Sequence, residues 1–150
     1  MLIIGNGKVL TRDPSMPYLT DGAVLCDGET IAALGGTAQL RAQYPHAEYL
    51  DAHGGVIMPG LINTHTHIYS GLARGLSIRG YDPHTFYQVL DGMWWNIDRH
   101  LDLEGTRASA VITAMESLRN GVTTIFDHHA SYGEIPGSLF AIAEETKKIG

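Results

Sequence analysis

Hydrophobic residues in the first 58 positions occur in short runs separated by turn residues. The turn signals are Gly5-Asn6-Gly7 and Asp27-Gly28, which favour reversals between strands. One short helix is expected over residues 38–44, and Pro45 would end it. The pattern therefore predicts a small β-rich module over residues 1–58. Its expected strands are residues 2–4, 8–10, 23–26, 30–34, 48–50 and 55–58.

The pattern changes after Pro59-Gly60 to strands alternating with helices. Residues 61–67 and 122–127 are apolar or β-branched runs, and each is expected to be a strand. Strands that alternate with helical segments are typical of a parallel sheet. Two parallel strands do not make a stable finished sheet. We therefore expect residues 59–150 to be the start of a larger α/β fold.

Three helices are expected between and after these strands. The first begins at Asp82-Pro83, because aspartate is a good N-cap and proline fits the first turn. The second covers residues 103–119 and ends at Asn120-Gly121. The third begins at a Ser138 cap and runs to about residue 149. Apolar residues recur at three- and four-residue steps, namely Phe86, Leu90, Met93, Trp94 and Ile97 in the first helix and Val111, Met115 and Leu118 in the second.

Composition and charge narrow the classes of function. The chain is 44% hydrophobic and 17% charged, as globular proteins are. Its net charge of −6, with scattered Lys and Arg, disfavours a nucleic-acid partner. No apolar run approaches the roughly 18 residues of a membrane span, no signal peptide is evident, and the single Cys26 has no internal disulfide partner. We expect a soluble cytoplasmic protein.

Two histidines, His65 and His67, end the first strand expected after Pro59. Side chains of a strand alternate between faces, so both imidazoles would point the same way and could share one metal ion. The C-terminal ends of parallel strands are where barrel active sites lie. The alternative is a hydrogen-bonded pair of histidines with no metal. A catalytic zinc usually takes three protein ligands, and this motif supplies two.

A second pair, His128 and His129, ends the second expected strand in TTIFDHHAS. Being adjacent, the two side chains would face opposite sides. One of them could contact the substrate or hydrogen-bond to a metal ligand. Either could equally be satisfied by the backbone or by Asp127. The sequence alone does not distinguish the role of His128 from that of His129.

Three segments resemble the amidohydrolase superfamily: MLIIGNGKVLTRDP, PGLINTHTHIYSGLARGLS and RNGVTTIFDHHAS. They look most like its chlorohydrolase/aminohydrolase branch, which includes guanine, cytosine and methylthioadenosine/S-adenosylhomocysteine deaminases, and within it like the SsnA-type aminohydrolases. The resemblance implies an α/β fold in which a composite β-sandwich accompanies a (β/α)8 TIM barrel. Residues 1–58 would then belong to the sandwich-type module. Residues 59–150 would be the first two β/α units of the barrel, which is incomplete in this chain.

The same resemblance implies one divalent metal, zinc or iron, held first by His65 and His67. The remaining family ligands and the acid-base residues are expected beyond residue 150, so no acid-base residue is assigned. Asn63 stands where dihydroorotase- and hydantoinase-like relatives usually carry aspartate, which favours the single-metal deaminase branch. The implied reaction is hydrolysis of a C–N bond other than a peptide bond. Metal-activated water would deaminate a small aminated heterocycle, a purine, a pyrimidine or a related ring.

Two other functions stay open. One is a cyclic amidase or dihydroorotase-like hydrolase, which a carboxylated lysine on a later strand would reveal. The other is a truncated, non-catalytic relative that acts as a binding or assembly module through exposed apolar faces. We expect the 150 residues alone to bind metal weakly and not to turn over. A full-length protein of this kind could be a homodimer.

Overall fold

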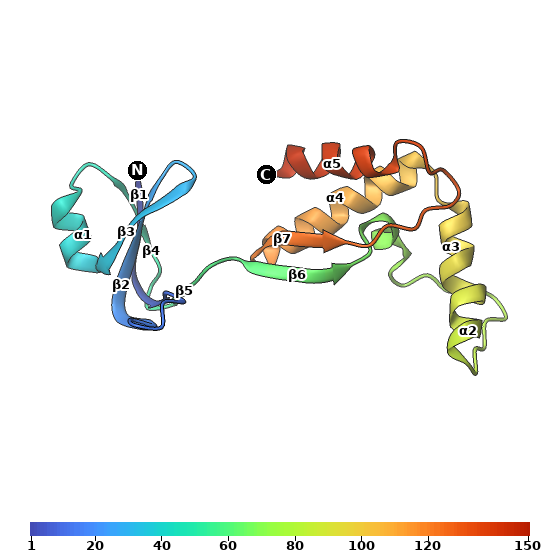
Figure 1. Cartoon of the computed structure of the whole chain (residues 1–150), viewed down its shortest axis with the longest axis horizontal. Coiled ribbons are helices and arrows are strands. Elements are labelled where there is room, and N and C mark those ends of the chain that lie inside the picture. The colour runs from blue at the N-terminus through green and yellow to red at the C-terminus, as the bar shows by residue number, and fades with distance from the viewer. The chain divides into compact units, whose positions relative to one another are not determined.

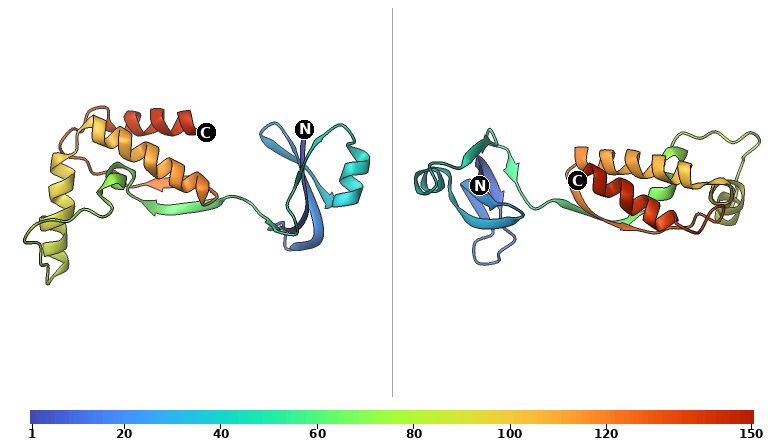
Figure 2. Two further views of the ribbon diagram at one scale, coloured as in Figure 1. Left: turned by 180° about the vertical axis from the view of Figure 1, so that it is seen from behind. Right: turned by 90° about the horizontal axis from the view of Figure 1, so that it is seen from above.

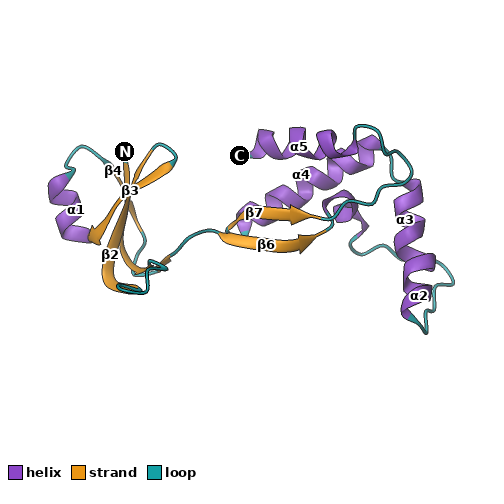
Figure 3. Ribbon diagram, viewed as in Figure 1, coloured by secondary structure: helices purple, strands orange, loops and turns teal.

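The computed structural model describes all 150 residues, and the chain divides into two compact units, Met1–Pro59 and Gly60–Gly150 (Figure 1). The first unit is a five-stranded sheet with one helix (Figure 3). Its order is β3-β2-β1-β4, with β5 also paired to β1. The elements are β1 (Leu2–Leu10), β2 (Tyr18–Asp27), β3 (Thr30–Gly36), α1 (Thr37–Gln43), β4 (Glu48–Asp51) and β5 (Val56–Ile57). The β-rich prediction is confirmed, although these residues form one sheet rather than two packed sheets.

The Gly5-Asn6-Gly7 segment was expected to be a turn, and this prediction is wrong. β1 continues through this segment, which forms a bulge within the strand. The pairing with β2 shifts in register between Ile4 and Gly7, and Asn6 has φ 53°. Asparagine tolerates the left-handed region better than most residues. The Asn6 N–H donates to Thr37 Oγ1 at 2.9 Å, and its side-chain amide donates to Asp51 Oδ1 at 2.7 Å. These bonds replace the sheet partners that the bulge loses. By contrast, Asp27-Gly28 does form the turn between β2 and β3.

The second unit contains the parallel pair β6 (Leu61–Thr66) and β7 (Val122–Asp127), as predicted. Helices α4 (Leu103–Arg119) and α5 (Ser138–Ile149) lie side by side over one face of this pair (Figures 1 and 2). Between the strands the chain also forms η1, a 3-10 turn (Ile68–Ala73), α2 (Phe86–Val89), η2, a π-helical turn (Leu90–Trp94), and α3 (Trp95–His100). None of these helices is both long and apolar enough to cross a membrane.

The predicted helix start at Asp82-Pro83 is wrong by three residues. Thr85 is the N-cap and forms a reciprocal capping box with Gln88, which satisfies two free N–H groups at once. The helix then passes through the π-helical turn, which inserts an extra residue and rotates the face that follows. None of the residues predicted to form the apolar face of this helix is fully buried, and Phe86 is 74% exposed. The third helix also starts differently, since Gly137 rather than Ser138 is its N-cap.

Helix α4 has the predicted length, but it buries a different face. Met115 and Leu118 are about half exposed, at 48% and 49%. The buried residues are small, namely Thr106, Ser109, Ala110 and Ala114. They allow close approach of η1: the Leu72 N–H donates to Ser109 Oγ at 3.3 Å. Ala110 belongs to the same core cluster as Ile68, Tyr69 and Ile142.

The loop after β7 is fastened to the junction between α3 and α4. The Gly133 N–H donates to the Asp98 carbonyl at 2.9 Å, and Glu134 accepts from the Leu103 N–H at 2.8 Å at the start of α4. A Cβ at Gly133 would lie 2.4 Å from the Leu101 carbonyl oxygen and 2.7 Å from that of Arg99. Only glycine permits this approach. The loop that carries His128 and His129 is therefore held against α3.

Replacing Ala110 by leucine should destabilise the second unit by about 1–3 kcal/mol, because the closely packed face of α4 has no room for the added atoms. Met115→Ala, which alters the face predicted from the sequence, should change stability by less than about 0.5 kcal/mol. Chemical denaturation followed by tryptophan fluorescence measures this, since both tryptophans, Trp94 and Trp95, lie in the second unit. A larger cost for Met115→Ala than for Ala110→Leu would contradict the observed packing.

Gly133→Ala should destabilise the same unit by about 2–3 kcal/mol, because the new methyl group meets two backbone carbonyls that cannot move independently. Tyr132→Ala is the matched control, since Tyr132 is the adjacent residue and is 64% exposed. It should cost less than about 0.5 kcal/mol. Equal stability of the two variants would show that the loop is not fastened at Gly133.

Candidate functional site

His65 and His67 converge where β6 ends. β6 closes at Thr66, and His67 follows with φ −125° and ψ 82°, which keeps its side chain on the same side as that of His65. The two Nε2 atoms lie 3.2 Å apart, with ring centroids at 5.2 Å. His65 is exposed and His67 is partly buried. The expectation that both imidazoles share one face therefore agrees with the geometry.

The ring of His67 is oriented by the neighbouring strand. Its Nδ1 lies 3.0 Å from the carbonyl oxygen of His128. A carbonyl only accepts hydrogen bonds, so Nδ1 carries a proton, and in the neutral ring Nε2 then presents its lone pair towards His65. The His128 N–H in turn donates to the Thr66 carbonyl at 2.8 Å, which extends the pairing of β6 and β7 beyond the strand ends.

The geometry of the pair suits two of the coordination positions of a single divalent ion. Two histidine nitrogens at 2.0–2.1 Å from one zinc ion and near-tetrahedral angles lie about 3.3 Å apart, close to the observed 3.2 Å. The same distance also suits a hydrogen bond from one Nε2–H to the other Nε2. No group of three or more His, Cys, Asp or Glu side chains in the chain is arranged to hold a metal. These residues therefore offer two ligands of an unfinished set.

The side chains of Asn63 and Asp127 hydrogen-bond to backbone N–H groups around the pair. Asn63 Oδ1 accepts from the His65 N–H at 3.3 Å. Asp127 Oδ1 accepts from the Ile68 N–H at 2.8 Å, which fixes the turn directly after His67 to the end of β7. Asp127 thus bonds to this turn rather than to either histidine of the second pair.

His128 and His129 have different surroundings. The His128 ring is exposed and lies 5.2 Å from the His67 ring. His129 turns away: its Nε2 lies 2.7 Å from Ser131 Oγ and its ring lies 5.1 Å from that of Tyr69. Burial lowers the pKa of His129, while the charges of Asp127 and Asp98 oppose this. Only His128 of this pair lies beside the converging imidazoles.

Sequence reasoning missed two buried residues next to the pair, Tyr69 and Asp98, each 3% exposed. Burial raises the pKa of the Asp98 carboxyl, and the hydrogen bond from the Tyr69 hydroxyl opposes this. Burial and the nearby Asp98 also raise the pKa of Tyr69. A signal was present, because Asp98 lies four residues after Trp94 and so shares its helix face. Trp94 itself lies 6.1 Å from His67, ring to ring.

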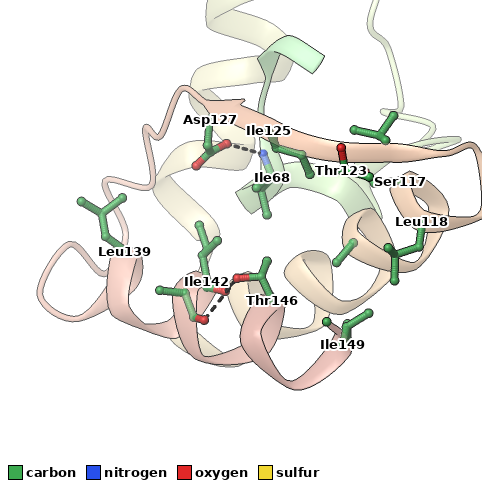
Figure 4. A pocket seen from close by; sticks show the side chains of 14 residues that line it. Ile68, Ser117, Leu118, Thr123, Ile125, Asp127, Leu139, Ile142, Thr146 and Ile149 are labelled. Atoms are coloured by element: carbon green, nitrogen blue, oxygen red, sulfur yellow. Dashed lines mark hydrogen bonds between the residues drawn. The ribbon is translucent and has the colours of Figure 1, made fainter. Parts of the chain in front are cut away.

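A pocket of about 480 Å³ lies away from the histidine pair, among β7, α4 and α5 (Figure 4). Its lining is mainly aliphatic, including Ile125, Ile142 and Leu118, and it contains none of the four histidines. It is the space between the strands and the helices that cover them. The convergent polar groups lie at the strand ends instead.

Two family descriptions match parts of the chain. Residues 22–47 match an imidazolonepropionase-like composite domain of bacteria, and residues 56–150 match the amidohydrolase family. The second match covers more than half of the chain and includes every residue of the histidine site.

Individual relatives agree with this family. A 5'-deoxyadenosine deaminase of Methanococcoides burtonii is 31% identical over 134 residues, which is 89% of this chain and 29% of the relative. A 5-methylthioadenosine/S-adenosylhomocysteine deaminase of Syntrophobacter fumaroxidans is 33% identical over 149 residues, covering 96% of this chain and 33% of the relative. The chain thus spans about a third of the length of these relatives.

Solved structures of hydrolases share the fold. The atrazine chlorohydrolase TrzN of Arthrobacter aurescens, complexed with zinc, matches with a TM-score of 0.79 and 28% identity, over 100% of this chain and 34% of its own. E. coli guanine deaminase matches with a TM-score of 0.78 at 22% identity, over 99% of this chain and 35% of its own, which bears on the fold alone. The predicted α/β class and the predicted resemblance are confirmed. On the match over residues 56–150, this chain belongs to the amidohydrolase family.

Proposed function

We propose that this chain is the N-terminal part of a metal-dependent hydrolase that deaminates a small aminated heterocycle. The observation that carries the proposal is the convergence of His65 Nε2 and His67 Nε2 at 3.2 Å, with the other nitrogen of His67 held by the His128 carbonyl. Metal-ligating histidines characteristically donate their second ring N–H to such an acceptor. The deaminase relatives support a purine nucleoside derivative as the substrate class.

Residues of this chain would supply the first half of the metal site. His65 and His67 would hold one divalent ion, and imidazole suits both zinc and iron. The zinc in the structure of the atrazine chlorohydrolase TrzN favours zinc over iron. When bound, such an ion lowers the pKa of its water so that hydroxide is available near neutral pH.

The residues around the pair would orient the metal ligands and contact the substrate. The His128 carbonyl keeps the proton of His67 on Nδ1, so that the Nε2 lone pair stays available to a metal. The exposed His128 ring stands beside the pair and would contact the substrate. Trp94 lies 6.1 Å from His67, ring to ring, and would provide an apolar wall on that side. His129, bonded to Ser131, would act only through Tyr69.

The domain organisation is part of the same proposal. Residues 1–58 would form part of a composite sandwich and residues 59–150 the start of a (β/α)8 barrel. The division of the chain at Pro59 and the composite-domain match over residues 22–47 support this. The parallel β6–β7 pair with α4 and α5 is the layout that successive barrel units have.

Zinc titration of the 150-residue chain tests the proposal. We expect one zinc ion to bind weakly, because two ligands are fewer than the three that a catalytic site uses. His65→Ala and His67→Ala should each weaken binding at least about tenfold, since each removes one of two ligands. His84→Ala is the control, because His84 is exposed and its closest ionic partner is Asp82.

The outcomes separate the alternatives. Binding that survives the double variant His65→Ala/His67→Ala would contradict the assigned site. Absence of zinc binding by the unaltered chain would favour the non-catalytic binding module. Steady-state deamination of 5'-deoxyadenosine by the chain alone, abolished by His65→Ala, would contradict the expectation that these residues do not turn over by themselves.

A further inference from the structure

Besides His65, three aromatic rings lie near the ring of His67, and they differ in exposure. Tyr69 lies edge-on at 6.0 Å between ring centroids and is 3% exposed, so its ring is not open to a ligand. The His128 ring, at 5.2 Å, is exposed. The Trp94 ring, at 6.1 Å and tilted by 35°, is partly exposed. Of these three, Trp94 therefore offers the one large apolar ring that a ligand beside the pair can reach.

Core packing does not explain why Trp94 lies there. A tryptophan side chain usually stabilises a fold by burying its large apolar surface in the core. The core cluster of the second unit is formed by Ile68, Tyr69, Ala110 and Ile142, with Leu101, Ile125 and Ala130 packed against it. Trp94 belongs to neither group, so its contribution to this core is small.

The local backbone places Trp94 beside His67. Trp94 closes η2, the π-helical turn over Leu90–Trp94, and such turns are frequent at functional sites. A Cβ at Gly92 would lie 3.0 Å from two ring carbons of Tyr81, so the Tyr81 ring lies against the backbone of this turn. The position of the indole therefore follows from the π-helical turn and from its contact with the loop that precedes it.

We propose that Trp94 is a substrate-binding residue, and that the planar ring of an aminated heterocycle stacks on its indole next to the histidine pair. The identity of this ligand rests on the proposed function. Stacking on an aromatic side chain tolerates any planar base, because every base has a π-face. A ring with saturated carbons lacks a complete π-face. Trp94 would thus favour a purine or a pyrimidine over the cyclic amides of the alternative hydrolase class.

The chain has two tryptophans, and either can be left as the only one, which gives a matched test. Trp95 is the control, since it follows Trp94 directly and is also partly exposed, but its ring meets that of Tyr87 edge-on at 5.6 Å. Trp95→Phe retains only Trp94, and Trp94→Phe retains only Trp95. Each variant is titrated with 5'-deoxyadenosine and, separately, with dihydrouracil, whose ring is not aromatic, both with and without zinc.

We expect 5'-deoxyadenosine to quench the fluorescence of Trp94 to saturation, because a purine stacked on an indole quenches its emission. Trp95 should show only the small linear loss that collisions cause, and dihydrouracil should quench neither tryptophan to saturation. Trp94→Leu should weaken binding of 5'-deoxyadenosine about 5–150-fold, as removal of one stacking ring does. Broadening of the ligand's ¹H resonances measures this, and Trp95→Leu should leave the affinity nearly unchanged.

Equal quenching of the two tryptophans, or no quenching of Trp94, would overturn the proposal. Equal affinities of Trp94→Leu and Trp95→Leu would do the same. The phenylalanine variants keep an aromatic ring at each position, so the fluorescence test does not depend on the folding of Trp94→Leu.

The metal site is judged separately by zinc titration. Zinc binding without quenching of Trp94 would support the proposed function and remove the stacking role. Saturable quenching of Trp94 in a chain that binds no zinc would support the stacking role and contradict the metal site.

Discussion

The hydrogen bond from His67 Nδ1–H to the His128 carbonyl at 3.0 Å is the contact on which the site depends. It joins the ends of two parallel strands that are 61 residues apart in sequence. It also decides which nitrogen of His67 is free, because the carbonyl can only accept. Without it, His65 and His67 would still share a face, but either ring nitrogen of His67 could carry the proton.

That bond requires β6 and β7 to be held in a fixed register, and backbone contacts provide this. The His128 N–H donates to Thr66, and Asp127 accepts from the Ile68 N–H, so the turn after each strand is tied to the other strand. The small residues of α4 allow η1 to approach, and Gly133 allows the later loop to reach α3. Close backbone approach at these positions, together with the buried side chains of Ile68 and Tyr69, sets the position of the histidines.

The sequence predicted features that depend on local periodicity. The apolar and β-branched residues of 122–127 predict a strand, and the alternation of side chains along a strand brings His65 and His67 to one face. Local pattern could not show that Asn6 continues a strand, since the bonds to Thr37 and Asp51 that satisfy it come from distant residues. It misassigned the buried face of α4 because Val111, Met115 and Leu118 look like a core stripe. The alternative stripe of Ser109, Ala110 and Ala114 is buried by its neighbours, which periodicity does not specify.

The same distinction between local pattern and contacts with distant residues applies to the candidate site. His65 and His67 lie two residues apart at the end of β6, so their spacing alone predicted that they converge. The different positions of His128 and His129 depend on the path of the loop after β7, which spacing does not specify. Asp98 shares the helix face of Trp94, but a lone aspartate in a helix is usually exposed, so its burial was not predicted. Its burial depends on the packing of α3 against η1 and against the loop after β7, and these contacts between distant segments are not specified by local periodicity.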